Sequence, residues 1–132
     1  MISITEYFAG KPHTAAHEQN FSELSSKVDA MLSYLGYTPP SCPNTGSQIS
    51  GSKGGSGDGG FRLQTATTGT GNSSHKEAKG IDLYDPADTL DHMLTDDVLD
   101  RFRLYREHPY STHTWCHLTT RAPSSGHRTF LP

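Results

Sequence analysis

The chain has 132 residues and a formal net charge of −3 at pH 7, and only 32% of its residues are hydrophobic. This length suits one domain, residues 1–132, with a modest core. The negative charge and scattered basic residues argue against a nucleic-acid partner, and no apolar run is long enough for membrane insertion. We therefore expect a small core that is supported by something further, such as a bound metal.

The two cysteines, Cys42 and Cys116, are far apart in the sequence, so we expect reduced thiols rather than a disulfide framework. The N-terminus lacks the charged start and apolar centre of a signal peptide, so the chain is expected to be made and folded in a cytoplasm. Eight histidines in so short a chain raise the expectation of metal binding.

The N-terminal part, residues 1–37, is predicted to be helical. Residues 17–35 carry apolar side chains three and four positions apart, which predicts one apolar helix face, made by Phe21, Leu24, Val28, Met31, Leu32 and Leu35. Gly36 follows as a C-terminal stop. Residues 2–8 are expected to pack as a short cap on this helix.

Residues 38–60 form a Gly- and Ser-rich stretch without periodicity, which is typical of a flexible loop. Within it, GGSGDGG lacks the Gly-Lys-Ser/Thr ending of a phosphate-binding loop and does not follow a strand that feeds a helix. Long loops in small domains are usually functional or disordered. We expect residues 44–60 to close over substrate, because their glycines permit hinge motion.

Residues 61–132 are predicted to hold the core of any site. Short strands are expected at 61–67, 81–84 and 114–120. Between the last two, a helix is predicted with Asp85 as N-cap and Pro86 at the first helical position. Its apolar face is built from Leu90, Met93, Leu94 and Val98, with Leu99, Phe102 and Leu104 as a further extension.

The order of these elements predicts an α+β domain in which two main helices pack on a small antiparallel sheet. The tail that follows the last strand reads as a loop. Its apolar end, at Phe130 and Leu131, is expected to tie it down against the domain.

His75, Asp82 and His117 are the candidate metal ligands. Asp82 stands between Ile81 and Leu83, so in an extended chain it faces opposite to both. Imidazole nitrogen and carboxylate oxygen bind zinc at about 2.0–2.2 Å, and three protein ligands with one open position are typical of catalytic sites. From spacing alone, the favoured interpretation is a surface loop histidine for His75 and a strand-end carboxylate that caps a helix for Asp82, and His117 reads as a core histidine bonded to the backbone.

The residues around this triad resemble a known family. Ser73-x-His75 followed by Asp82 resembles the S-x-H-x(6)-D signature of the M15 zinc peptidases. That family includes D-alanyl-D-alanine carboxypeptidases and phage endolysins, and it shares a zinc-site fold with the hedgehog signalling domain. Gly-Phe-Arg at 60–62 is similar to the family's Gly-Tyr-Arg element, and Trp-Cys-His at 115–117 resembles its W-x-H.

Two further stretches, LYREHP at 104–109 and the segment 115–132, are similar to the C-terminal part of phage-encoded members. The resemblance covers residues 60–132 well and the first helix more loosely. It implies a hedgehog-like zinc domain in which His75, Asp82 and His117 hold Zn²⁺. It also implies that Arg62 and Ser73 serve substrate binding, where a guanidinium fork suits a carboxylate or carbonyl of a peptide.

The function that the resemblance implies is a zinc-dependent peptidase that cleaves peptidoglycan stem peptides. Such a protein is a phage endolysin, which acts at the wall after release from the host cytoplasm, or a wall hydrolase carried in the phage particle beside other virion proteins. A non-catalytic virion component that keeps the zinc fold is the alternative, and a metal-free binding module is a third possibility.

The proton shuttle departs from the family pattern. Where many members place an acid, three residues before or two residues after the last histidine, this chain has Thr114 and Thr119. We expect Glu107 to act as the catalytic acid and base, with His113 as the second candidate. The competing interpretations are an exposed helix-end ion pair for Glu107 and a plain turn residue for His113.

Cys116 could in principle be a fourth, soft ligand. If residues 114–118 form a strand, however, its side chain points opposite to that of His117. A buried core thiol is therefore the prediction for this residue.

Overall fold

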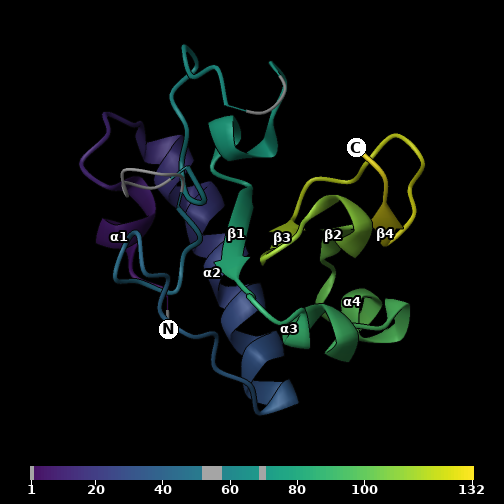
Figure 1. Cartoon of the computed structure of the whole chain (residues 1–132). Helices are drawn as coiled ribbons and strands as arrows, with labels where there is room; N and C mark the ends of the chain where they lie inside the picture. Colours follow the sequence, from purple (N-terminus) through teal and green to yellow (C-terminus); the bar gives the residue numbers. More distant parts are fainter. Residues whose placement is uncertain (1, 52–57, 69–70) are drawn as a thin grey trace.

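The structure, a computed structural model, describes residues 2–51, 58–68 and 71–132. The part of the 38–60 loop between residues 52 and 57 therefore lies outside the described residues. In chain order the elements are α1 (Ile4–Phe8), α2 (Ala15–Leu35), the 3₁₀ turn η1 (Ser74–Glu77), β1 (Gly80–Tyr84), α3 (Thr89–Met93), α4 (Asp96–Phe102), β2 (Tyr105–Glu107), the 3₁₀ turn η2 (Pro109–Ser111), β3 (Trp115–Thr119) and β4 (Thr129–Phe130). Figure 1 shows α2 passing behind β1.

The long helix α2 confirms the prediction for residues 17–35 and begins two residues earlier. The Thr14 hydroxyl accepts a hydrogen bond from the His17 N–H at 3.2 Å and so caps its first turn. Gly36, with a φ of 65°, ends it in the left-handed conformation that glycine adopts without strain. The predicted apolar face is buried except at Leu35, which is half-buried, and α1 packs beside it through Tyr7 and Phe8, as expected of a short cap.

The sheet has the strand order β1-β3-β2-β4. β1 and β2 each pair with β3 in the antiparallel sense, but β4 pairs with β2 in parallel. The sheet is therefore mixed, and the prediction of an antiparallel sheet was wrong at this edge. The reason is that β3 ends beside the start of β2, where Thr119 lies opposite Tyr105, so the returning chain enters β4 at that end and runs alongside β2.

Residues 61–67 do not form the predicted strand. Phe61 and Arg62 are buried, but their N–H groups donate to the carbonyls of Tyr7 and His75, at 3.0 Å and 3.2 Å, rather than to a neighbouring strand. The first two N–H groups of this segment are thus satisfied by α1 and η1, and that of Ala66 by the carbonyl of Leu63 within the segment. The segment is held in place without belonging to the sheet.

The helix predicted after Asp85 is two short helices, so α2 is the single long helix among the described residues. The Asp85 carboxylate does accept the N–H groups of Leu90 and Asp91, at 3.0 Å and 3.1 Å, but α3 begins only at Thr89 and leaves Pro86 in the preceding turn. Leu94 is extended, and a new N-cap at the next residue starts α4. The expectation of two main helices was therefore wrong.

The C-terminal tail is anchored at one of its two predicted residues. Phe130 lies in β4 opposite Glu107 and is half-buried, whereas the Leu131 side chain is 70% exposed.

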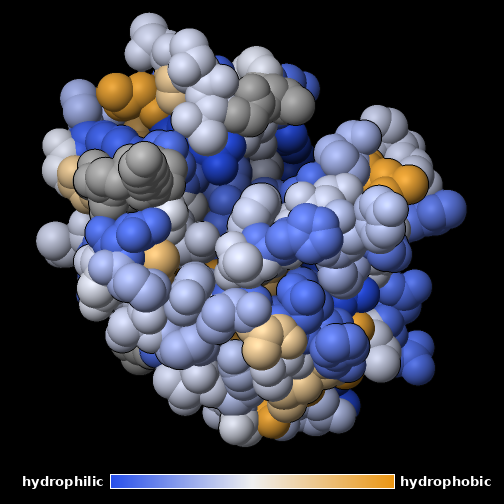
Figure 2. Space-filling view, in the orientation of Figure 1, coloured by the Kyte–Doolittle hydropathy of each residue, from blue (hydrophilic) through white to orange (hydrophobic). Residues whose placement is uncertain are grey.

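Within the described parts of the chain, no helix combines the length and the apolar character that crossing a membrane would require. The face of the molecule in Figure 2 is mostly hydrophilic, with small and scattered hydrophobic patches.

Candidate metal centre and its pocket

The register between β1 and β3 places two of the candidate ligands side by side. Asp82 lies directly opposite His117 in the antiparallel pair. Ile81 and Leu83, which flank Asp82, are fully buried in the core. Because side chains alternate along a strand, this burial turns Asp82 and His117 together toward the opposite face of the sheet.

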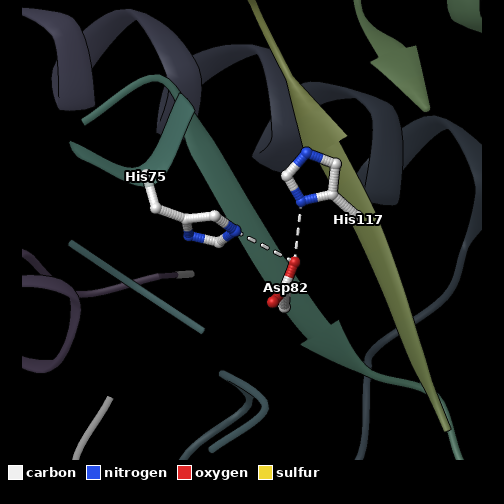
Figure 3. Close-up of side chains that lie close together, drawn as sticks. All are labelled: His75, Asp82 and His117. Carbon is white, nitrogen blue, oxygen red and sulfur yellow. Dashed lines mark hydrogen bonds and ion pairs between the residues drawn. The ribbon is translucent and has the colours of Figure 1, made fainter. Parts of the chain in front are cut away.

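The third candidate reaches the same point from η1. The nearest nitrogens of His75 and His117 both approach one oxygen of Asp82, Oδ1, at 3.2 Å for His75 Nε2 and 2.7 Å for His117 Nδ1 (Figure 3). The ligand atoms of the three residues all lie within 4.8 Å of one another, and the three residues are buried. This cluster could hold a metal ion.

The hydrogen bonds of His75 define which of its nitrogens is free. Nδ1 lies 2.8 Å from the carbonyl oxygen of Gly60. A carbonyl can only accept, so Nδ1 carries the proton and Nε2 of the neutral ring has a lone pair. That lone pair faces the carboxylate oxygen of Asp82, which is also an acceptor, and two facing acceptors make a favourable place for a cation.

The electrostatics of the cluster match this arrangement. Burial lowers the pKa of the His75 imidazole despite the nearby carboxylate of Asp82, which favours the neutral ring that a metal needs. Burial alone would raise the pKa of the Asp82 carboxyl, but the two imidazoles, His75 foremost, hold that pKa well below its usual value through the positive charge they carry when protonated and through their hydrogen bonds. A neutral imidazole and an ionised carboxylate are the protonation states of metal ligands.

The position of His75 depends on close backbone packing at Gly60. A Cβ on Gly60 would approach the carbonyl oxygen of Tyr7 to 2.3 Å, so a side chain does not fit there. The same Tyr7 carbonyl accepts the N–H of Phe61 at 3.0 Å, and the Tyr7 hydroxyl donates at 2.7 Å to the carbonyl of Gly80, the first residue of β1. Tyr7 therefore binds the segment whose Gly60 carbonyl holds His75 and the first residue of the strand that carries Asp82, so α1 is part of the support of the site.

Sequence reasoning did not identify the role of Tyr7. The contacts that give Tyr7 this role join segments far apart in the chain, and its sequence neighbourhood shows only a short apolar cap. The Gly59-Gly60 pair was the one signal that could have pointed here, because paired glycines often mark a close approach of two backbones.

A pocket of about 600 Å³ opens over the cluster, and Figure 2 shows it as a hollow between the part that carries η1 and the C-terminal part. The predicted residues Arg62, Ser73 and Glu107 line it. Trp115 and Phe130 belong to its apolar wall. His113, by contrast, is exposed and does not line the pocket, so the structure does not bring it to the cluster.

Glu107 is in β2 and not at a helix end, which removes the main argument for an exposed helix-end ion pair. Arg106 lies opposite Leu118, so the next step along this antiparallel ladder brings Glu107 beside His117. Arg106 faces the other side, where its Nη1 lies 3.6 Å from Asp91. Glu107 is half-buried, and burial, reinforced by the charge of Asp82, raises the pKa of its carboxyl.

The two threonines and Cys116 have different surroundings. Thr119 is buried and lines the pocket, whereas Thr114 is exposed and has a φ of 76°. Cys116 lies opposite Leu83 and is fully buried in the core, as predicted from the alternation of the strand. Burial raises the pKa of this thiol well above its usual value, which keeps it protonated.

A second acidic group, formed by Asp85, Asp88 and Asp91, has oxygens within 4.8 Å of one another. Both oxygens of Asp85 already accept N–H groups at the start of α3, and Arg106 is paired with Asp91. Burial raises the pKa of the Asp91 carboxyl to about 6. We interpret this group as the support of α3 and of one ion pair.

Comparison with protein-family models, with curated proteins and with solved structures gives no match for this chain. What the site does must therefore be inferred from its own residues. These are two imidazoles and a carboxylate at the floor of a pocket, with a half-buried glutamate beside them.

Proposed function

We propose that this chain is a zinc-dependent peptidase that hydrolyses peptide bonds in peptidoglycan stem peptides, as a phage endolysin or a virion-associated wall hydrolase. The single observation that supports a bound metal is that the lone pair of His75 Nε2 faces Asp82 Oδ1 at 3.2 Å. His117 Nδ1 lies 2.7 Å from the same oxygen. A cation between these atoms would relieve the opposition of two acceptors. A hedgehog-like zinc fold is part of this proposal.

The donor set supports zinc among the divalent metals. Two imidazoles and one carboxylate are typical of zinc sites that keep a fourth position open. When bound, the ion would supply a Lewis acid that polarises a peptide carbonyl and lowers the pKa of water. His75, Asp82 and His117 would hold it, and their burial limits competition from solvent.

Glu107 would move the proton. Its carboxylate takes a proton from the attacking water, whose oxygen forms the new bond to the peptide carbon. The same carboxyl then gives that proton to the leaving amine as the carbon–nitrogen bond breaks. A raised pKa suits this double role, because a catalytic group works best when its pKa lies near the working pH.

The choice of peptidoglycan follows from the resemblance of residues 60–132 to the M15 peptidases. The pocket is compatible with a peptide substrate, because it combines serine and threonine hydroxyls with the apolar side chains of Trp115 and Phe130. Hydroxyls can bond to peptide groups, while the apolar wall can cover aliphatic parts of the stem.

The test is a turbidity assay on outer-membrane-permeabilised cells, with zinc and with a chelator. We expect zinc-dependent clearing that falls by about 10²–10⁴-fold in Glu107→Gln, while zinc content stays the same. Glu23→Gln, an exposed glutamate on α2, is the matched control, and His113→Asn should retain clearing. A wild-type chain that binds zinc but clears nothing would contradict the peptidase and favour the non-catalytic virion component.

A further inference from the structure

Arg62 is only 8% exposed, although it lines the pocket. Its Nε donates to the carbonyl of Asp58 at 2.7 Å, and Nη1 lies 3.4 Å from both the carbonyl of Thr68 and the hydroxyl of Ser73. Its Nη2 lies 3.4 Å from Oδ2 of Asp82. All three guanidinium nitrogens therefore face acceptors of the protein itself.

The two oxygens of Asp82 have separate partners. Oδ1 faces the imidazoles of His75 and His117, while Oδ2 faces Arg62. A cation on Oδ2 restrains rotation of the carboxylate about its Cβ–Cγ bond, so that Oδ1 stays directed at the imidazoles. Partners of this kind fix the orientation of a metal ligand and raise its affinity for the ion.

We infer that Arg62 is a positioning residue for Asp82 and not an anchor for the substrate. This inference rests on the proposed metal function of the cluster. Capture of a carboxylate by arginine needs two parallel N–H groups that are free to point at it. In Arg62, Nε and Nη1 are already directed at Asp58, Thr68 and Ser73.

Ser73 extends the same support to His75. Its hydroxyl oxygen accepts the backbone N–H of His75 at 3.2 Å and lies next to Nη1 of Arg62. Arg62 thus contacts Asp82 directly, and through Ser73 it supports the backbone segment that carries His75. Both residues that the resemblance assigns to substrate binding act, by this inference, on the metal ligands.

Arg121 provides the matched comparison, because it lines the same pocket but does not contact a ligand. Its Nη1 lies 2.6 Å from Oε2 of Glu77 and its Nη2 lies 2.6 Å from the carbonyl of Asn72. Its side chain is 33% exposed, against 9% for that of Arg62. Replacement of either arginine by lysine keeps the positive charge and removes the guanidinium group. A difference between the two variants therefore reports where the guanidinium lies and not its charge.

The experiment is a zinc titration in competition with a chromophoric chelator, carried out on the full chain. Arg62→Lys should bind zinc about 10–100-fold more weakly than the wild type, and Arg121→Lys should bind it as the wild type does. At saturating zinc, KM for a wall peptide should change less than about two-fold in Arg62→Lys, whereas loss of a substrate anchor would raise it. Ser73→Ala should weaken zinc binding in the same direction, and it replaces Arg62→Lys as the test if the latter does not fold.

The alternatives give different results. Unchanged zinc affinity in Arg62→Lys would overturn the inference, as would unchanged affinity in Ser73→Ala if Arg62→Lys does not fold. A raised KM together with unchanged zinc affinity would make Arg62 a substrate anchor. A wild-type chain that binds no zinc at all would instead overturn the proposed function on which the inference rests.

Discussion

Oδ1 of Asp82 lies 2.7 Å from Nδ1 of His117, and these two residues stand directly opposite each other on β1 and β3. The strand pairing itself thus sets their distance. We predict that Asp82→Asn, which keeps the shape of the side chain but removes its charge, weakens zinc binding. Loss of a residue that only supports a ligand costs about 10–100-fold in affinity, and the loss in Asp82→Asn should be larger. Isothermal titration calorimetry with zinc measures this directly. Asp97→Asn, at an exposed position of α4, should bind like the wild type, and equal loss in both variants would argue against a specific site.

Gly60 connects the support of the site to its chemistry. In Gly60→Ala the added carbon would meet the Tyr7 carbonyl, and the backbone must move away from it. That movement shifts the carbonyl that holds His75 Nδ1. We predict a lower thermal stability and zinc binding that is weaker by about 10–100-fold, measured by melting curves and zinc competition.

Gly71→Ala is the control for this substitution, because a Cβ at Gly71 meets nothing within 4 Å. It should leave both the melting temperature and zinc affinity close to those of the wild type. If Gly60→Ala behaves in the same way, the backbone contact with Tyr7 does not position His75.

Cys116 should not contribute to metal binding. Its side chain is in the core on the opposite face of β3 from His117, and burial raises the pKa of its thiol. We predict that Cys116→Ala still binds one zinc per chain while it loses some stability through the small cavity that forms. Zinc content by elemental analysis and unfolding in urea measure the two effects. A variant that folds but holds no zinc would make the thiol a ligand.

The metal-free chain should lose stability on acidification through His75. Its folded-state pKa lies below the usual 6.5 because the ring is buried, so the unfolded chain takes up the proton first as the pH falls through that value. Asp82, whose pKa is also depressed, adds a further loss below about pH 4. Asp91 acts in the opposite sense, since burial raises its pKa to about 6 and protonation then favours the folded state.

Comparison with His75→Gln separates these contributions. The unfolding free energy of the wild type minus that of His75→Gln should fall as the pH is lowered from about 7 to about 5, because Asp91 contributes equally to both proteins and the wild-type Asp82 carboxyl, whose pKa is depressed, titrates below this range. Urea unfolding at a series of pH values gives this difference. A difference that does not change with pH would contradict a buried, neutral His75.

The sequence was informative where one physical pattern dominates. The apolar spacing of α2 is long and ends at a glycine, so both the helix and its end could be predicted. Asp82 between two core residues could be predicted to face away from the core. That it stands directly opposite His117 could not, because strand register depends on tertiary packing and not on either strand alone.

The secondary-structure predictions were wrong or incomplete where the local sequence fits more than one structure or shows no clear periodicity. Apolar spacing continues from Leu90 to Val98, yet α3 ends at Met93 and α4 begins after a threonine N-cap. In β2, Arg106 is buried toward Asp91 while Glu107 lines the pocket, so the strand has charges on both faces and no apolar alternation. Residues 61–67 have the composition of a strand, but their backbone partners are α1 and η1.

The most direct test is X-ray absorption at the zinc edge on the purified chain after dialysis against dilute zinc. The account predicts one zinc per chain with nitrogen and oxygen neighbours at about 2.0–2.2 Å, including the scattering pattern of two imidazoles. A chain that retains no zinc, or a sulfur neighbour at about 2.3 Å, would contradict a centre built from His75, Asp82 and His117.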